Sequence, residues 1–491
     1  MELVDIFEKK TQNQLYILKN VFLNHGEVNF KQLSTTTFLD FKTVKNLWED
    51  ISTYIDDEIT LNSKQNYLLV RAKIIKESWV YQLCEKLLLK KELPLQSFIN
   101  THYISESKFR RKKKDLNNMI SYLQIKIISK GGFIYIRGKE LQIRKLAQQF
   151  FWGIYRGTEW PFKEIDYKKI DTFFKNYLFI NHHILIKEVT YVEWYYNFSI
   201  NLIRFNNGGF IKYNELPSYT DVYFSEISNL EPLKILLEKK FYLPLEEQYY
   251  FLYSLQMRLQ YYLDKDLVNQ TINAQKKCSI DTLYIYEELI AELKINKPNF
   301  KESTIARAVI LSANMSATIH QGFYRDISSY LVGEFFEEKV PNLLPNIEKK
   351  VLQLKKNNPH ISFLNEVKYL TIKYSEAYSL IENMFDFEPE VKVLITTDSS
   401  IVLEELMVRK LNSIFSMGAN ATFMTTNSDL ATSCDLLIKT TSLMKDIPNN
   451  KEILIVEPNL TEKDISEIKV KIEEITKIKK LETNYELETG L

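Results

Sequence analysis

The sequence is poor in cysteine, glycine and proline. Its three cysteines, Cys84, Cys278 and Cys434, lie far apart among 491 residues, with neither a C-x-x-C pair nor a nearby histidine. Disulfide frameworks and zinc clusters need paired or clustered thiols, so we interpret these cysteines as reduced structural thiols. Glycine and proline number 12 each, which argues against a collagen-like or disordered chain and favours a largely helical one.

The sequence also lacks a long apolar run and a signal peptide. No segment approaches the roughly eighteen uninterrupted apolar residues that a membrane-spanning helix needs. The first residues, Met-Glu-Leu-Val-Asp, are acidic and show no signal-peptide pattern. We therefore expect a cytoplasmic protein that has no membrane partner.

The motifs of several common enzyme classes are absent. The sequence contains no G-x-x-x-x-G-K-S/T, H-E-x-x-H, G-x-S-x-G or G-x-G-x-x-G pattern. The segment 397–400, Thr-Asp-Ser-Ser, could bind an anion at a helix N-terminus, but the polar loop of an inert α/β domain explains it equally well. We expect a binding protein, not an enzyme, with no cofactor and no metal.

Positive charge is concentrated near the N-terminus. The whole chain has a formal net charge of +1, yet residues 1–147 contain 25 basic and 16 acidic residues, a net charge of +9. The remainder therefore carries −8. This asymmetry predicts a polyanion-binding end attached to a neutral or acidic body. The length alone predicts roughly three or four domains.

The densest positive charge lies between Ser105 and Gly138, where six of the seven residues from Lys108 to Lys114 are basic. Apolar residues from Phe109 to Leu123 recur on one helical face, and Ser105 is a natural N-cap, so we predict a helix with a buried stripe and a cationic front. Two alternating apolar runs joined by Ser-Lys-Gly-Gly follow and predict a β-hairpin. A helical pattern through residues 74–88 and a short helix at residues 95–101 complete a winged helix-turn-helix.

A similar pattern precedes it. Residues 11–23 and 30–36 predict two helices, Asp40 caps a third that contains inward Phe41, Val44, Trp48, Ile51 and Ile55, and residues 59–61 and 67–70 predict a second wing. A single basic run is as often a solvated helix face, but two such units in tandem favour DNA binding. The candidate DNA contacts are Lys42, Thr43, Lys45, Asn46, Lys64, Ser107, Lys108, Arg110, Arg111, Lys112, Lys113, Lys114 and Lys130.

Few residues of the recognition helices suit the discrimination of bases. They are chiefly Asn46, Arg110, Arg111, Asn117 and Asn118. We therefore expect readout of the DNA backbone and shape to matter more than readout of a strict sequence.

The segment Ile136–Arg144 follows the second unit and looks like the l-x-G-x-E-x-x-i-R junction of Mga/AtxA-type virulence regulators, through Gly138, Glu140 and Arg144. The resemblance implies a cytosolic transcription regulator of Gram-positive bacteria, here an activator. It implies a mostly α, multidomain fold with two winged helix-turn-helix domains (1–72 and 73–147), two helical phosphotransferase-system regulation domains, or PRDs (148–285 and 286–388), and a C-terminal enzyme IIB-like domain (389–491).

In PRDs a phosphorylatable His lies seven residues before an Arg. Asn197 occupies that position before Arg204, so the first PRD has lost the site if this alignment holds. His182 and His183 lie nearby, and we interpret them as polar residues at a helix end, with His183 the weaker phosphorylation candidate. His320, in the helical run 300–327 with inward Ile305, Ala308, Leu311 and Met315, is the preferred candidate, although a lone His is more often structural. His360, after Pro359, is a weaker candidate than His320.

Residues 391–477 alternate between short apolar strands and helices, which predicts an α/β domain with a parallel sheet. In the enzyme IIB fold that it resembles, a Cys directly follows the first strand. Here residues 396–400 read Thr-Thr-Asp-Ser-Ser, and Cys434 precedes a different strand. We therefore expect a binding or dimerising module that lacks phosphocysteine transfer.

Together with the resemblance, these inferences predict a regulator of virulence or sugar-linked genes that binds double-stranded DNA. We expect it to be a homodimer whose subunits pair through the C-terminal α/β domain. The resemblance adds RNA polymerase and the phosphocarrier protein HPr as partners. The alternatives are an RNA-binding antiterminator, which would begin with a β-rich module, and a signalling scaffold that does not bind DNA.

Overall fold

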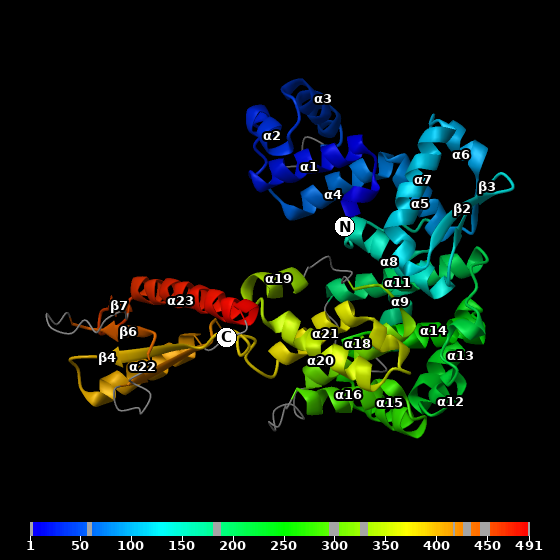
Figure 1. Cartoon of the computed structure of the whole chain (residues 1–491). Helices are drawn as coiled ribbons and strands as arrows, with labels where there is room; N and C mark the ends of the chain where they lie inside the picture. The colour runs from blue at the N-terminus through cyan, green and yellow to red at the C-terminus, as the bar shows by residue number, and fades with distance from the viewer. Residues whose placement is uncertain are drawn as a thin grey trace. The chain divides into compact units, whose positions relative to one another are not determined.

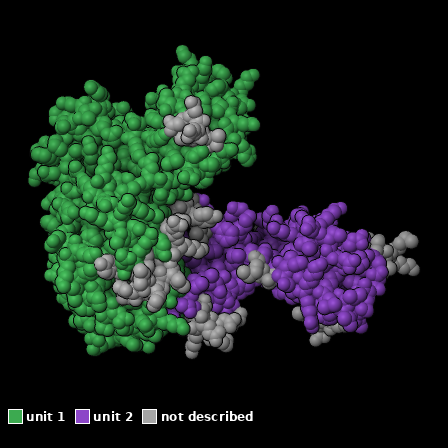
Figure 2. Space-filling view, turned by 180° about the vertical axis from the view of Figure 1, so that it is seen from behind, with its two compact units in different colours: residues 1–290, 308–330, 359–370 green, residues 291–307, 331–358, 371–491 purple. Residues whose placement is uncertain are grey.

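The computed structural model describes residues 3–55, 61–179, 188–293, 304–324, 332–415, 418–425, 434–441 and 452–489. The chain divides into two compact units (Figure 2). Unit 1 comprises residues 1–290, 308–330 and 359–370, and unit 2 comprises residues 291–307, 331–358 and 371–491. Helices dominate both units, and the second also contains a parallel sheet (Figure 1).

Unit 1 begins with a helical module, which we call the first module. It contains a 3₁₀ turn (Leu3–Ile6) and helices α1 (Lys9–Leu23), α2 (Phe30–Thr37), α3 (Phe41–Ser52) and α4 (Lys64–Glu77). The Asn29 side chain caps α2 and the Asp40 carboxylate caps α3 by accepting backbone N–H groups of the first turns. Leu18, Val44 and Ile51 are fully buried among these helices. The three predicted helices are confirmed, but Phe41 is exposed instead of inward.

The predicted wing of the first module is wrong. Its second strand, residues 67–70, lies inside α4, which the Ser63 hydroxyl caps by accepting the Asn66 N–H at 3.1 Å. Ile59 and Thr60, from its first strand, fall outside the described residues. The error arose because a short apolar run such as Tyr-Leu-Leu-Val fits a helix and a strand equally well.

The second module is a winged helix-turn-helix, as predicted. It contains α5 (Trp79–Leu89), β1 (Glu92–Pro94), α6 (Leu95–Thr101), α7 (Glu106–Ile120), a 3₁₀ turn (Ser121–Leu123), β2 (Lys126–Lys130) and β3 (Phe133–Arg137). The strands form an antiparallel sheet in the order β1-β3-β2. The single helix predicted through residues 74–88 is wrong, because Ser78 ends α4 and its hydroxyl caps α5 at the Tyr81 N–H.

A helical region follows in unit 1. Its elements are α8 (Glu140–Tyr155), α9 (Tyr167–Phe173), a π turn (Phe174–Phe179), α11 (Glu188–Asn206), α12 (Thr220–Ser225), α13 (Glu231–Phe241), α14 (Leu245–Gln256), α15 (Lys265–Lys277), α16 (Asp281–Glu292) and α18 (Thr304–Ile319), with 3₁₀ turns at Tyr213–Glu215, Ser228–Leu230, Leu259–Leu263 and Ser362–Asn365. Aromatic rings form its core: Phe198 packs on Phe173, Phe241 and Phe251 with ring centroids 4.9–5.2 Å apart. Ile305 is exposed, contrary to the prediction, while Ala308, Leu311 and Met315 are buried.

Unit 2 contains α19 (Val332–Lys339), α20 (Leu343–Asn357), most of α21 (Val367–Ser379) and an α/β domain. The domain consists of β4 (Val391–Thr396), α22 (Ile401–Phe415), β5 (Ala421–Thr425), β6 (Leu436–Lys439), β7 (Glu452–Ile455) and α23 (Glu462–Thr489). All its strand pairs are parallel, in the order β5-β4-β6-β7, which confirms the predicted parallel sheet. Apolar residues of α22 and α23 pack against the same sheet face, which includes Val391, Val393 and Ile395.

Candidate nucleic-acid interface

Helix α7 separates an apolar face from a polar one. Phe109 and Leu116 are buried, and the Ser105 hydroxyl accepts the Lys108 N–H at 3.2 Å to fix the start of the helix. Successive residues turn by about 100° around a helix, so Ser107, Arg111, Lys114 and Asn118 form one stripe opposite the buried pair. All four are exposed. We call these four residues the α7 stripe.

Two further basic residues flank the α7 stripe. Lys108 and Arg110 are both exposed, on opposite sides of it. Arg110 Nε lies 3.1 Å from Glu106 Oε1, an exposed pair between successive helical turns. Helix α7 contains six basic and two acidic residues, a net charge of +4. It therefore presents a strongly cationic outer face.

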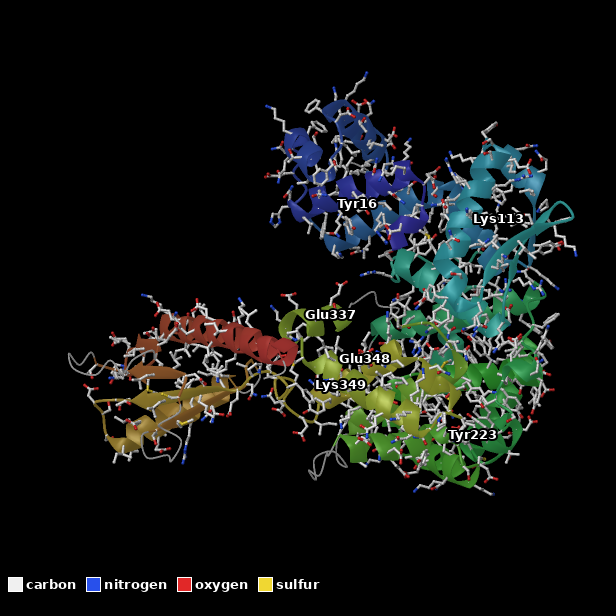
Figure 3. The ribbon with its side chains drawn as sticks, viewed as in Figure 1. Tyr16, Lys113, Tyr223, Glu337, Glu348 and Lys349 are labelled. Carbon is white, nitrogen blue, oxygen red and sulfur yellow. The ribbon has the colours of Figure 1, made fainter. Side chains whose placement is uncertain are left out.

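The structure directs Lys112 and Lys113 away from this face. Lys112 Nζ donates to the Phe7 carbonyl oxygen at 3.0 Å, and Lys113 Nζ donates to Ser129 Oγ at 3.0 Å. Figure 3 labels Lys113 on α7. Burial lowers the pKa of both ammonium groups. Both lysines flank the buried stripe on a helical wheel, so the sequence already contained the signal that distinguishes them from Arg111 and Lys114.

Asn117 holds the hairpin against α7. Its Nδ2 donates to the Ile127 carbonyl oxygen at 2.9 Å, and its Oδ1 accepts the Ile127 N–H at 2.6 Å. The side chain is therefore engaged with β2, whereas Asn118 is exposed. This paired hydrogen bond gives the helix and the hairpin a fixed relation.

The hairpin formed by β2 and β3 turns at Gly131 and Gly132, whose φ angles are +59° and +82°. Two successive positive φ angles are typical of a type I′ turn, which glycine adopts without steric cost. Ile127 and Ile134 are buried on the inner face of the hairpin. Lys126 and Lys130 have the opposite parity and are exposed, as is Arg137, which pairs with Lys126. Lys126 and Arg137 were not among the predicted contacts, although strand parity could have identified them.

The corresponding helix of the first module, α3, is less cationic. Lys42, Lys45 and Asn46 are exposed, but so is Glu49, and the helix has no net charge. Thr43 Oγ1 donates to Asp40 Oδ2 at 2.6 Å, and this bond, together with the Thr43 backbone N–H, lowers the pKa of Asp40. The Thr43 hydroxyl is therefore part of the helix cap.

Lys64 lies at the first position of α4, not in a wing. Its Nζ lies 5.2 Å from the centre of the Phe22 ring and 4.9 Å from that of Tyr67, and the two rings stack on each other. Burial is the largest cause that lowers its pKa. The cation therefore packs on aromatic faces of its own module.

A buried ion network lies at the start of α8, where the second module meets the helical region. Arg204 of α11 donates from Nε and Nη2 to the two oxygens of Glu140 at 2.9 and 2.7 Å. Arg144 Nε donates to Glu140 Oε1 at 3.1 Å, and its Nη1 and Nη2 donate to Glu247 at 2.6 and 2.9 Å. We call Glu140, Arg144, Arg204 and Glu247 the ion network.

Neighbouring backbone groups complete this network. Arg204 Nη1 lies 3.2 Å from the carbonyl oxygens of Leu87 and Lys90, at the end of α5. Burial alone would raise the pKa of Glu140, but the arginine charges and hydrogen bonds outweigh it and lower that pKa. A Cβ at Gly209 would lie 2.8 Å from Glu140 Oε1, so glycine leaves the room that the network needs.

The predicted phosphorylation sites lie in different surroundings. His182 and His183 fall outside the described residues. Asn197 lies on α11 and lines a small pocket with Trp194, Ser254 and Arg258 among others. His320 is only 4% exposed, with Nε2 3.2 Å from the Tyr250 hydroxyl oxygen, and burial holds its pKa well below the usual range. His360 is exposed in a loop after α20.

The loop after β4 is occupied by side chains of its own domain. Glu404 Oε2 accepts the Thr397 N–H at 3.1 Å, and Thr440 Oγ1 accepts the Asp398 N–H at 3.2 Å. These contacts use N–H groups that an anion would need. Within the described ranges, no cluster of three His, Cys, Asp or Glu residues could hold a metal ion. No helix that the structure describes combines the length and apolar character needed to cross a membrane.

Residues 63–151 match the family model of the Mga helix-turn-helix domain. The matched residues include α4, the whole winged second module and most of α8. No curated protein matches the chain. The resemblance to Mga-type regulators is therefore confirmed at the module that carries the α7 stripe, the hairpin and two residues of the ion network.

Proposed function

We propose, starting from the Mga helix-turn-helix domain at residues 63–151, that this protein is a transcription regulator that acts by binding duplex DNA. The observation that carries the proposal is the α7 stripe with its flanking cations, which faces away from the core of the second module. The +4 charge of α7 is suited to a polyanion.

In this proposal α7 enters the major groove, which is about 12 Å wide and accommodates one helix. Arg111 and Asn118 face base edges, and Lys108 and Lys114 contact phosphates. The hairpin lies along the neighbouring backbone, with Lys126, Lys130 and Arg137 as phosphate contacts. Because cations outnumber residues suited to base readout, the binding energy comes mainly from the backbone and from DNA shape.

The first module binds more weakly in the same mode. Lys42, Lys45 and Asn46 supply its contacts, and Glu49 opposes them at the same surface. A module without net charge on its recognition helix adds length to the footprint more than it adds affinity.

The wider assignment is that of a cytoplasmic activator of virulence or sugar-linked genes, which works as a homodimer and catalyses no reaction. Helix α22 supports dimerisation through the α/β domain. Its residues Ile401, Val402, Leu403 and Leu406 are 53–69% exposed, an apolar surface of the kind that subunit interfaces cover. A dimer doubles the number of phosphate contacts and makes occupancy steeply dependent on protein concentration.

Regulation by phosphorylation completes the proposal, with His320 as the acceptor and HPr as the donor. His320 lies at the end of α18, and the phosphorylatable His of second PRDs supports the choice. Its burial against Tyr250 requires the segment 320–324 to open before transfer. Radiolabelling with phosphotransfer proteins tests this step: a His320→Ala variant should lose the label, and equal labelling of both forms would exclude His320.

The central test is a DNA titration followed by fluorescence anisotropy. The variant K108A/R111A/K114A should bind a mixed-sequence duplex at least about tenfold more weakly than the wild type at low salt, because three exposed cations are lost. A matched control, K168A/K169A/K239A, removes three exposed lysines of the helical region and should bind like the wild type. Equal affinity of all three proteins would refute the assigned interface, and no binding by the wild type would refute the function.

A further inference from the structure

Two aromatic residues of the helix-turn-helix modules are almost completely exposed. Phe38 is 95% exposed and Tyr103 is 97% exposed. Both adopt left-handed backbone conformations, with φ angles of +55° and +49°. This conformation favours glycine, and for a bulky residue it is strained. The two residues therefore combine an unfavourable backbone with an unfavourable exposure of apolar surface.

Phe38 and Tyr103 occupy the same position in the two modules. Each lies in the turn that joins the two helices of its helix-turn-helix, two residues before the N-cap of the second helix: Asp40 for α3 and Ser105 for α7. Each is followed by an apolar residue that packs inward, Leu39 or Ile104. An exposed aromatic residue with a left-handed backbone at the same position of both modules indicates a function that the two modules share.

The fold itself does not need the rings. The left-handed residue closes α6, because it lets the Ile104 N–H reach the Ile99 carbonyl oxygen at 3.2 Å. Glycine would make this turn at lower steric cost, and a ring that is 97% exposed contributes almost no packing. Packing within the module therefore gives the Tyr103 ring no role.

We propose that Phe38 and Tyr103 contact duplex DNA beside the recognition helices, packing on the deoxyribose and base edges that border the major groove. The inference rests on the proposed function. Ser107 lies four positions after Tyr103, so their Cα atoms lie within about 14 Å of each other. The major groove is about 12 Å wide, so with α7 in the groove the ring of Tyr103, whose Cα lies within about 14 Å of that of Ser107, would lie at the groove wall. Apolar contacts of this kind complement the cations of the α7 stripe.

The duplication favours DNA over a protein partner. DNA is the ligand that two helix-turn-helix modules have in common, whereas a single protein partner would not require the same aromatic position in each. The position also lies next to the N-terminal end of α7, whose first turn includes Ser107 and Lys108, both exposed.

The chain provides a matched control in Tyr242. It has a φ of +54°, is 83% exposed, and follows the end of α13. There the Leu243 N–H lies 3.5 Å from the Leu237 carbonyl oxygen, six residues back, whereas the Ile104 N–H bonds the carbonyl five residues back. Tyr242 precedes α14 of the helical region, not a recognition helix. It therefore reproduces the left-handed φ and the exposure of Tyr103 without its position.

The experiment compares F38G, Y103G, F38G/Y103G and Y242G with the wild type in duplex titrations over a series of salt concentrations. Glycine suits the left-handed backbone, so all variants should fold and melt at or above the wild-type temperature. Y103G should weaken binding about five- to tenfold, and the double variant further, while Y242G binds like the wild type. The slope of log affinity against log salt should stay unchanged in each, because an aromatic contact releases no counterions.

Affinity of F38G/Y103G equal to that of the wild type would overturn the inference but leave the proposed function intact, provided that K108A/R111A/K114A binds weakly. Wild-type affinity together with reduced transcription by RNA polymerase would assign the rings to a protein partner and likewise overturn it. Failure of the wild type to bind duplex DNA would refute the proposed function itself.

Discussion

Replacement of Glu140 by Gln should destabilise unit 1 strongly, because Glu140 is the carboxylate that both arginines of the ion network contact. Its side chain accepts three hydrogen bonds, from Arg144 and Arg204, at 2.7–3.1 Å. Arg144 is 0% and Arg204 3% exposed, so neither guanidinium can recover its hydration after the loss. Removing one partner of a buried ion pair typically costs about 3–5 kcal/mol.

A loss of this size should lower the melting temperature of unit 1 by roughly 5–15 °C. The measurement is thermal and urea unfolding, followed by far-ultraviolet circular dichroism. Asp50→Asn serves as the control, since Asp50 forms a 2.7 Å pair with Lys10 but is 46% exposed, and exposed pairs contribute less than about 1 kcal/mol. A Glu140→Gln variant that melts within a degree of the wild type would refute the reasoning.

The same carboxylate makes stability depend on pH. The pKa of Glu140 is lower in the folded protein than its ordinary value of 4.5. Its contribution is therefore fully present above about pH 4.5 and is lost as the pH falls through the folded pKa. Unfolding of the wild type should become easier in that acidic range, and the Glu140→Gln variant should show a shallower dependence.

Three further outcomes are expected. Lys114→Ala should reduce the salt slope of DNA binding by about 0.9, whereas Lys112→Ala should change it little, because Lys112 already donates to a backbone carbonyl; equal slopes would contradict this distinction. Glu106→Gln should strengthen DNA binding about two- to fivefold in anisotropy titrations, because it removes a negative charge and frees Arg110; weaker binding would count against it. Gly209→Ala should destabilise unit 1 by about 1–3 kcal/mol in urea unfolding, because its Cβ would lie 2.8 Å from a network carboxylate oxygen; wild-type stability would show that the network can shift.

The second module could be predicted from sequence because its signals are local. Ser105 as a cap, the apolar spacing of Phe109 and Leu116, and the Gly131-Gly132 turn each act within a few residues, and all three agree with the structure. The wing predicted for the first module was wrong because its apolar run is short enough to fit either a strand or a helix. Packing of α4 against α1 selects the helix for residues 67–70, and a contact between distant segments cannot be inferred from the local pattern of a single sequence.

The sequence was enough to locate the candidate site on α7, but not to assign the role of each of its residues. The basic run correctly indicated α7, but the run alone does not distinguish Lys112 from Arg111, since their roles depend on which side of the helix faces the core. The ion network was not predicted at all, although the junction motif includes Glu140 and Arg144. Glu247 lies 103 residues from Arg144, and proximity over such a separation follows from the fold and not from the local pattern.

The contacts of Arg204 with the end of α5 have a mechanical consequence. One guanidinium joins the last turn of α5, the first helix of the winged module, to the interior of the helical region, so buried hydrogen bonds tie these two parts of unit 1 together at this point. In the proposed function, a change in the helical region that displaces Arg204 would therefore also displace the winged module that carries α7. In the homodimer proposed above, regulation would then act through the spacing and tilt of two winged modules on one duplex.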